Sequence, residues 1–162
     1  GAIALSIAQE VALAQVHAVE IDPVAYSWAK KNVLEHGQGR VFLHPEDLAD
    51  CLPELNGRVD LVISNPPYIP PGEVPRDPEV RDYDPSRALY GSGEDGLGEI
   101  RAVERTARRL LRPGGYVAVE HAECQANAVY WLFAEEKGWR DVRTRQDLTG
   151  RDRFVTARLS QD

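Results

Sequence analysis

One short segment, Asn65-Pro66-Pro67-Tyr68, contains the residue types needed to hold a planar nitrogen for chemistry. Each proline lacks an N–H and biases the residue before it toward an extended backbone, so Asn65 and Pro66 are kept out of the helical region. We expect the Asn65 side-chain oxygen and the Pro66 carbonyl to accept one N–H each from an amide or an arylamine. The Tyr68 ring would lie against the flat group. Catalysis in such a site is mainly positioning, and no strong base is needed.

The same four residues have a plainer interpretation, a rigid turn that leaves a buried strand. They directly follow an apolar run at residues 59–64 and open a stretch rich in Pro, Asp and Gly that extends to residue 96. Loops of that length are usually functional or disordered. The placement favours the chemical interpretation, and residues 65–68 are called the motif segment below. We expect residues 69–96 to be mobile and in part to close on the substrate.

Apolar runs and helix signals alternate along the chain. Asp22 and Pro23 are typical of a helix start, and Gly37 is typical of its end. We expect strands at residues 16–21, 40–44, 59–64, 116–120, 139–145 and 153–159, and helices at residues 2–10, 23–36, 47–55, 97–111 and 125–137. This order predicts an α/β fold with a mostly parallel sheet and an antiparallel C-terminal hairpin. Ligands of such sheets bind at the carboxyl ends of the strands.

The motif segment together with Ile69 resembles the catalytic motif of the methyltransferases that modify the glutamine amide of peptide-chain release factors. Further segments fall in the order and approximate spacing of that family: Asp84-Pro85, Ala88-Leu89, Asp95-Gly96-Leu97, Pro113-Gly114-Gly115, Glu120-His121, Gln125, and Asp147-Leu148 through Asp152-Arg153. The resemblance covers essentially the whole chain. It implies that residues 1–162 form a catalytic domain with the Rossmann-like fold of class I S-adenosylmethionine-dependent methyltransferases, and that Asn65, Pro66, Pro67 and Tyr68 are its catalytic residues.

The resemblance also implies a set of cofactor contacts. Glu20 matches the carboxylate that accepts from both ribose hydroxyls of S-adenosylmethionine, and its neighbour Asp22 is expected to cap the following helix. Asp47 matches the position that accepts from the adenine amine, although an Asp before a short helix is also an ordinary cap. Gly1 resembles the last glycine of the cofactor loop. The predicted cofactor-binding residues are Gly1, Glu20, Ile21, Asp47, Leu48 and Asn65. The coproduct would be S-adenosylhomocysteine.

Members of the family contain segments that have no counterpart in this sequence. The family's first strand, most of its glycine loop and a helical N-terminal domain that engages the substrate have no counterpart here, and the sequence contains no methionine. We therefore expect residues upstream of Gly1 in the protein.

Composition narrows the classes of partner. A net charge of -7 argues against a broad phosphate-binding face, so direct nucleic acid binding is not expected and a protein substrate is favoured. The two cysteines, Cys51 and Cys124, lack the paired spacing of a disulfide framework or a zinc site, and no metal is expected. The apolar runs are too short to span a bilayer, which leaves the cytoplasm as the expected location.

Two alternatives remain open. Similar Asn-Pro-Pro-Tyr motifs occur in enzymes that methylate adenine in DNA or RNA, so the motif alone specifies a planar nitrogen and not a protein. The second alternative is a non-catalytic scaffold with a cofactor-binding fold, and the intact motif segment counts against it. The arginines of the helix before Pro113 are expected to form a solvated face, or otherwise a docking patch for an acidic partner: Arg105, Arg108, Arg109 and Arg112.

Overall fold

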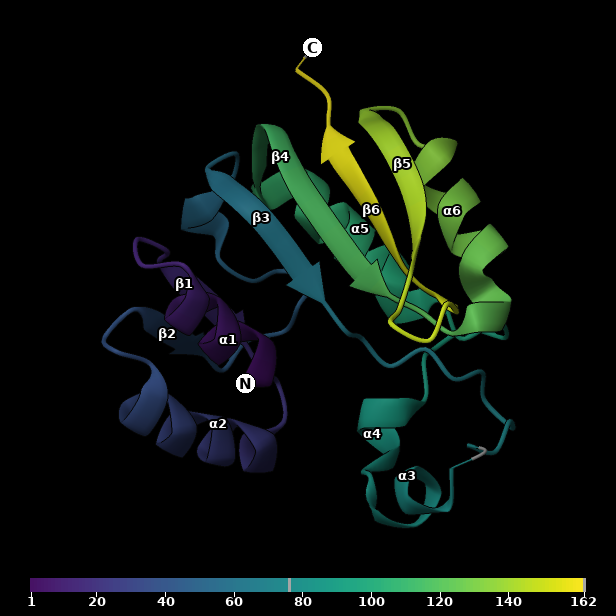
Figure 1. Cartoon of the computed structure of the whole chain (residues 1–162), viewed down its shortest axis with the longest axis horizontal. Helices are drawn as coiled ribbons and strands as arrows, with labels where there is room; N and C mark the ends of the chain where they lie inside the picture. Colours follow the sequence, from purple (N-terminus) through teal and green to yellow (C-terminus); the bar gives the residue numbers. More distant parts are fainter. Residues whose placement is uncertain (76, 162) are drawn as a thin grey trace. The chain divides into compact units, whose positions relative to one another are not determined.

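The computed structural model describes residues 1–75 and 77–161 and divides into two compact units, Gly1–Cys51 and Leu52–Asp162 (Figure 1). Each unit has its own sheet, with two strands in the first and four in the second. Among the described residues, none of the helices has the length and apolar character needed to cross a membrane.

The first unit is a parallel strand pair with its crossover helix. It contains α1 (Ala2–Glu10), β1 (Val16–Val19), α2 (Pro23–His36) and β2 (Val41–His44). The β1 and β2 strands pair in parallel from Val16↔Val41 to Val19↔His44. The helices 2–10 and 23–36 are confirmed, and the first strand ends two residues before its expected end. The carboxyl ends of β1 and β2 therefore lie at the same edge of this small sheet.

A side-chain cap fixes the start of α2. The Asp22 side chain accepts hydrogen bonds from the Val24 and Ala25 N–H groups, both at 2.9 Å, and Pro23 occupies the first helical position. Because the first N–H groups of a helix have no partner within it, this cap satisfies donors that would otherwise be lost. The cap predicted for Asp22 is confirmed.

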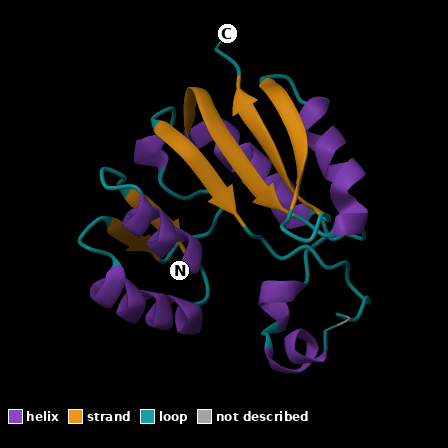
Figure 2. Ribbon diagram, viewed as in Figure 1, coloured by secondary structure: helices purple, strands orange, loops and turns teal. Residues whose placement is uncertain are grey.

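The second unit contains a mixed sheet with two long helices on one face. Its elements are η1 (Pro53–Leu55), β3 (Val59–Ser64), α3 (Pro78–Tyr83), α4 (Ser86–Leu89), α5 (Gly98–Leu110), β4 (Leu111–Glu120), η2 (Glu123–Gln125), α6 (Ala126–Ala134), β5 (Trp139–Gln146) and β6 (Asp152–Leu159). The strand order is β3-β4-β6-β5, with β3 and β4 parallel and the other pairs antiparallel (Figure 2). The expected α/β class and C-terminal hairpin are confirmed.

The core of this unit lies between the sheet and the two helices. α5 packs on β3 and β4, α6 packs on β5 and β6, and the two helices touch each other. The fully buried apolar side chains come from these elements: Ile100, Val103, Ala107, Val117, Val119, Val129, Phe133, Val155 and Ala157. Burial of this many branched and aromatic side chains, at about 25 cal/mol per Å² of apolar surface, fixes the sheet and therefore the ends of its strands.

Three expectations about elements were wrong. Residues 47–55 form turns and the short 3₁₀ helix η1, because Leu52 adopts a left-handed backbone (φ 51°) before Pro53, which cannot donate a helical hydrogen bond. The stretch 65–96 contains the helices α3 and α4. β4 begins at Leu111 and not at Tyr116, because three extra residues bulge out between the pairs Val59↔Leu111 and Leu61↔Tyr116.

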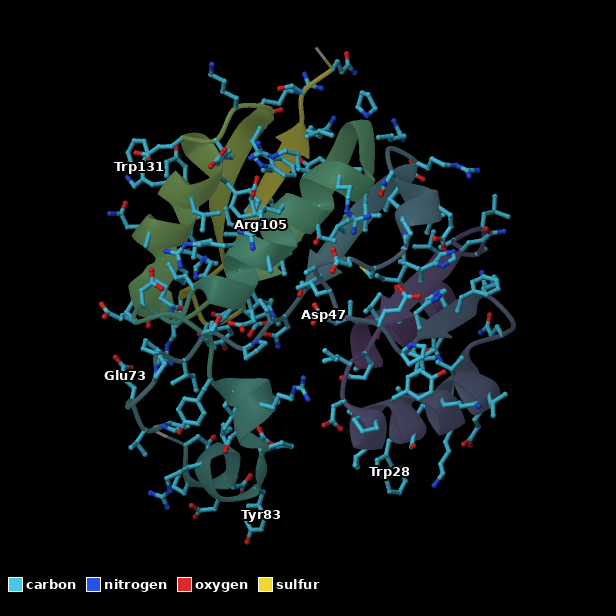
Figure 3. The ribbon with its side chains drawn as sticks, turned by 180° about the vertical axis from the view of Figure 1, so that it is seen from behind. Trp28, Asp47, Glu73, Tyr83, Arg105 and Trp131 are labelled. Atoms are coloured by element: carbon cyan, nitrogen blue, oxygen red, sulfur yellow. The ribbon has the colours of Figure 1, made fainter. Side chains whose placement is uncertain are left out.

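The three tryptophans differ in exposure. Trp139 is 9% exposed, while Trp28 on α2 and Trp131 on α6 are 61% and 50% exposed (Figure 3). The buried indole N–H of Trp139 donates to Glu104 Oε1 at 2.7 Å, which satisfies a donor that water cannot reach. Glu104 is itself 4% exposed and also accepts from Arg108. A buried carboxylate thus joins α5 to β5.

Candidate active site

The motif segment directly follows β3 at its carboxyl end. Asn65 is exposed there and Pro66 is buried, while Pro67 and Tyr68 are half-buried. Within the described residues, the Asn65 side chain makes no hydrogen bond. A rigid, partly buried backbone thus presents an amide side chain with both its polar atoms available, at the sheet edge where ligands of α/β proteins bind.

The Tyr68 ring is held by a hydroxyl contact. Its Oη donates to Glu120 Oε1 at 3.3 Å, and Glu120 is the last residue of β4, the strand next to β3. Burial raises the pKa of Tyr68, and the negative charge of Glu120 raises it further, while the positive charge of Arg153 opposes both effects. The phenol is therefore a neutral donor at ordinary pH.

The C-terminal hairpin contributes a charged group to the same place. Arg153, near the start of β6, interacts electrostatically with Tyr68 and Glu120. Its Nε donates to Asp147 Oδ2 at 3.3 Å. Asp147 Oδ1 also accepts from the Thr149 N–H at 2.8 Å, so the turn between β5 and β6 is organised around this carboxylate. The turn is thereby tied to the residues that surround the tyrosine.

Gln125 connects the motif segment to a second loop. Its Nε2 donates to the Tyr68 carbonyl at 2.8 Å and to the Asp95 carbonyl at 3.1 Å, while its Oε1 accepts from the Ala122 N–H at 3.1 Å. Several segments that carried the family resemblance therefore meet around Tyr68, although they are far apart in the sequence. The amino-acid sequence around each of these residues does not indicate the contacts.

His121 is completely buried beside this cluster. Its Nδ1 lies 2.9 Å from the Ala122 carbonyl, and because a carbonyl only accepts, Nδ1 carries the proton. Nε2 has no hydrogen-bond partner within the described residues. Burial lowers the pKa of His121 and outweighs the hydrogen bond to Ala122, so the ring is neutral near pH 7.

The predicted cofactor residues of the first unit lie just beyond its two strands. Glu20 follows β1 and its N–H donates to the His44 carbonyl at 3.0 Å, while its Oε1 accepts from the Asp22 N–H at 2.9 Å. Asp47 follows β2, and its Oδ1 accepts from the Ala49 N–H at 2.9 Å. Since no regular helix follows Asp47, it closes a turn and is not a helix cap. Both carboxylates thus have a set orientation near the carboxyl ends of parallel strands.

The other predicted cofactor residues of the first unit are Gly1, Ile21 and Leu48. Gly1 precedes α1, and a Cβ added there would lie 3.7 Å from the Ala29 Cβ, which is ordinary contact. Ile21 is 47% exposed. The Leu48 carbonyl accepts a hydrogen bond from the Cys51 thiol at 3.3 Å. These placements leave their roles as predictions.

Several arginines of α5 and of the start of β4 form ion pairs or hydrogen bonds within the chain. Arg108 pairs with Glu104 and Glu136, and Arg112 Nε pairs with Asp60 at 2.5 Å. Arg109 Nη1 donates to Asn56 Oδ1 at 2.6 Å. A cleft between α5 and α6 is lined by charged residues of both signs and one leucine: Arg101, Glu104, Arg105, Leu132, Glu135 and Glu136. These internal partners favour a structural role for Arg108, Arg109 and Arg112 over a docking patch. Among the described residues, no cluster of side chains has the composition of a metal site.

Comparisons with known proteins relate the chain to methyltransferases. The family model of the methyltransferase small domain matches residues 1–76. The release factor glutamine methyltransferase of Streptomyces coelicolor is 54% identical over 159 residues, which are 98% of this chain and 55% of that protein. The 4-amino-L-phenylalanine/4-methylamino-L-phenylalanine methyltransferase of Streptomyces pristinaespiralis is 43% identical over 145 residues, 90% of this chain and 48% of that protein. The chain thus spans about half the length of these curated relatives.

A solved structure supports the fold. The crystal structure of TrmN from Thermus thermophilus superposes with a TM-score of 0.65 at 21% identity and covers 98% of this chain and 41% of that one. The chain is a homologue, along almost its whole length, of the release factor glutamine methyltransferases, and its fold is that of the class I S-adenosylmethionine-dependent methyltransferases.

Proposed function

We propose that the protein that carries this chain methylates a glutamine side-chain amide in a peptide-chain release factor, with S-adenosylmethionine as donor and S-adenosylhomocysteine as coproduct. The observation that carries the proposal is the motif segment at the carboxyl end of β3, with Asn65 exposed there and the Tyr68 ring held by Glu120. The relatives named release factor glutamine methyltransferases support the choice of substrate.

The motif segment suits the substrate amide in three ways. The Asn65 Oδ1 and the Pro66 carbonyl are the two acceptors proposed for its N–H hydrogens, which would turn the nitrogen lone pair toward the donor. The Tyr68 ring would limit rotation of the planar group by stacking against it. After transfer, the nitrogen carries an extra proton and is acidic enough to lose it to water. No residue of the chain is needed as a strong base.

The first unit would hold the nucleoside part of the cofactor. Glu20 and Asp47 fit this role, because each presents a carboxylate just beyond a parallel strand in an orientation fixed by a main-chain N–H. A carboxylate with two oxygens matches the vicinal hydroxyls of a ribose. Gly1, Ile21 and Leu48 complete the proposed contacts there, and Asn65 is the proposed contact of the second unit. When bound, S-adenosylmethionine supplies an electrophilic methyl group on its sulfonium.

Residues 1–162 would act as one catalytic domain in the cytoplasm, with a release factor as protein partner. The net charge of -7 supports a protein substrate over a nucleic acid, because phosphate binding requires positive charge. Adenine N-methylation is the less favoured alternative for the same reason.

One relative favours a second candidate, methylation of an aromatic amine in a small molecule. The protein from Streptomyces pristinaespiralis is named for 4-amino-L-phenylalanine, and its nitrogen is planar like that of an amide. The same pair of acceptors in the motif segment would suit either group. Methylation assays with a release factor and with 4-aminophenylalanine, side by side, separate the two candidates.

The proposal is tested with radiolabelled S-adenosylmethionine and a release factor, and with a release factor in which the acceptor glutamine is replaced by alanine. We expect label only in the first. Asn65→Ala should reduce the turnover about 100-fold while the protein keeps much of its affinity for S-adenosylmethionine, measured by calorimetry, because Asn65 is one of several proposed cofactor contacts. Asn127→Ala, an exposed residue of α6, is the matched control. A protein that neither binds S-adenosylmethionine nor transfers label favours the scaffold alternative. An active protein whose Asn65→Ala variant has unchanged turnover overturns the role proposed for Asn65.

A further inference from the structure

Both polar atoms of the Gln125 side chain form hydrogen bonds with main-chain atoms. Gln125 is 7% exposed. Its amide nitrogen donates to the carbonyls of Tyr68 and Asp95, at 2.8 Å and 3.1 Å, and its oxygen accepts from the Ala122 N–H at 3.1 Å. One buried side chain therefore joins three segments: the motif segment, the loop before α5 and the turn after β4.

The hydrogen bonds of Gln125 to these three segments, called the tie below, require a side-chain amide. Two carbonyl oxygens converge on one side-chain atom, so that atom must carry two N–H donors. An ionised glutamate at position 125 would present only acceptors to the Tyr68 and Asp95 carbonyls, and methionine would present no donor. Because each unpaired buried carbonyl is costly, either substitution would let the two loops separate.

Close backbone packing supports the same arrangement. Gly96 adopts φ +70°, and a Cβ there would lie 2.6 Å from the Tyr68 carbonyl oxygen. The Ile69 N–H donates to the Leu89 carbonyl, and the Gly91 N–H donates to the Ile69 carbonyl, both at 2.9 Å. The main chain just after the motif segment is therefore held on several sides, and Gln125 supplies the side-chain bonds.

We propose that Gln125 is a positioning residue for methyl transfer. It acts through the Tyr68 main chain to orient the Asn65 side-chain oxygen and the Pro66 carbonyl, and its own polar atoms are all engaged within the chain. Because Pro66 and Pro67 have fixed φ angles, a shift at Tyr68 moves the whole motif segment. This inference rests on the proposed function, and it concerns a residue that touches neither the substrate nor the cofactor.

The test compares the protein with Gln125→Glu, and uses Gln161→Glu as the matched control because Gln161 is exposed. Four quantities are measured: amide hydrogen exchange, affinity for S-adenosylmethionine, and kcat and KM for release-factor methylation. For Gln125→Glu we expect at least about tenfold faster exchange at the Ile69 and Gly91 amides. We also expect kcat to fall about 100-fold, since a displacement near 1 Å costs that much. Cofactor affinity and exchange at Val117 and Ala157, in the β4–β6 ladder, should stay within about twofold of the parent values.

Each other outcome decides against the proposal. Unchanged exchange at Ile69 and Gly91 overturns the tie itself, and this result is obtained even if the parent protein proves inactive on release factors and the proposed function fails. Faster exchange with a normal kcat overturns the positioning role. A loss of kcat accompanied by faster exchange at Val117 means general destabilisation. If Gln125→Glu does not fold, Gln125→Met removes the same donors without adding a charge, and is judged by the same measurements.

Discussion

The Tyr68 hydroxyl donates to the Glu120 carboxylate at 3.3 Å, across 52 residues of sequence. Tyr68 lies shortly after the end of β3, and Glu120 is the last residue of β4. Because β3 and β4 pair in parallel, the pairing brings the two residues together. The contact links the aromatic residue of the motif segment to the rigid part of the sheet. It gives the ring an orientation that the motif segment alone would not supply.

Removal of the Tyr68 hydroxyl tests this link. Tyr68→Phe keeps the aromatic wall and loses the hydrogen bond to Glu120, so we expect kcat for release-factor methylation to fall about tenfold, since a bond to a charged group contributes about 1.5 kcal/mol. The affinity for S-adenosylmethionine should not change. Tyr130→Phe, on α6, is the control. A Tyr68→Phe variant with the parent kcat would show that Glu120 does not hold the ring in a way that matters for turnover.

Alanine variants of two glycines with nearly the same backbone conformation distinguish backbone strain from steric crowding. Gly57 and Gly96 have φ of +68° and +70°, but a Cβ at Gly57 meets nothing within 4 Å, whereas one at Gly96 meets the Tyr68 carbonyl oxygen. Gly57→Ala should lower the free energy of unfolding by about 1–2 kcal/mol, the cost of a left-handed alanine. Gly96→Ala should cost at least about 1 kcal/mol more, because it adds a clash. Urea unfolding of both variants gives the comparison, and equal losses would contradict it.

The loss of folding stability at low pH should depend on Asp95. Its hydrogen bonds to Arg101, with the Leu97 N–H as a further donor, lower the pKa of Asp95 to about 2. A carboxylate with a lowered pKa stabilises the fold above its unfolded pKa near 4, and this contribution is lost as the pH falls toward about 2. Asp95→Asn should therefore lower Tm at pH 7, with the difference shrinking between pH 4 and pH 2. Glu94→Gln is the control, and a difference independent of pH would contradict the prediction.

The buried carboxylate of Glu104 predicts a graded loss of stability. Its Oε1 accepts from the Trp139 indole N–H and from Arg108. Glu104→Ala leaves both donors without this acceptor, and we expect the free energy of unfolding to fall by about 3 kcal/mol. Glu104→Gln keeps an oxygen at the same place and should cost less than half as much. Urea unfolding followed by tryptophan fluorescence measures both, and equal effects would show that the acceptor is not what matters.

Elements with a strong local signal could be predicted from the sequence. Asp22-Pro23 predicted the start of α2 correctly, since capping and a fixed proline φ act within a few residues. The same pair recurs at Asp77-Pro78, where the Asp77 side chain accepts from the Glu79 N–H and α3 begins. That signal was available, and the surrounding proline-rich composition obscured it. The strand at residues 59–64 was predicted by its apolar run.

Contacts between distant segments could not be predicted. Nothing near Gln125 in the sequence indicates that its side chain bonds to Tyr68 and Asp95, because those bonds depend on where the sheet places each loop. The burial of Glu104 was likewise hidden, since its charged neighbours on α5 are typical of a solvated face. The sequence predicted the motif segment, and the structure adds the residues that support it.

The bond from Gln125 to the Tyr68 carbonyl also bears on how the chain folds. It spans 57 residues and joins the segments that follow β3 and β4, so it can form only after these two strands have paired. Closing a long loop costs chain entropy before the new contact contributes any stability, so contacts between distant segments form late in folding. During refolding, circular dichroism would therefore recover before catalytic competence does. A folding intermediate with native secondary structure would still lack an ordered site.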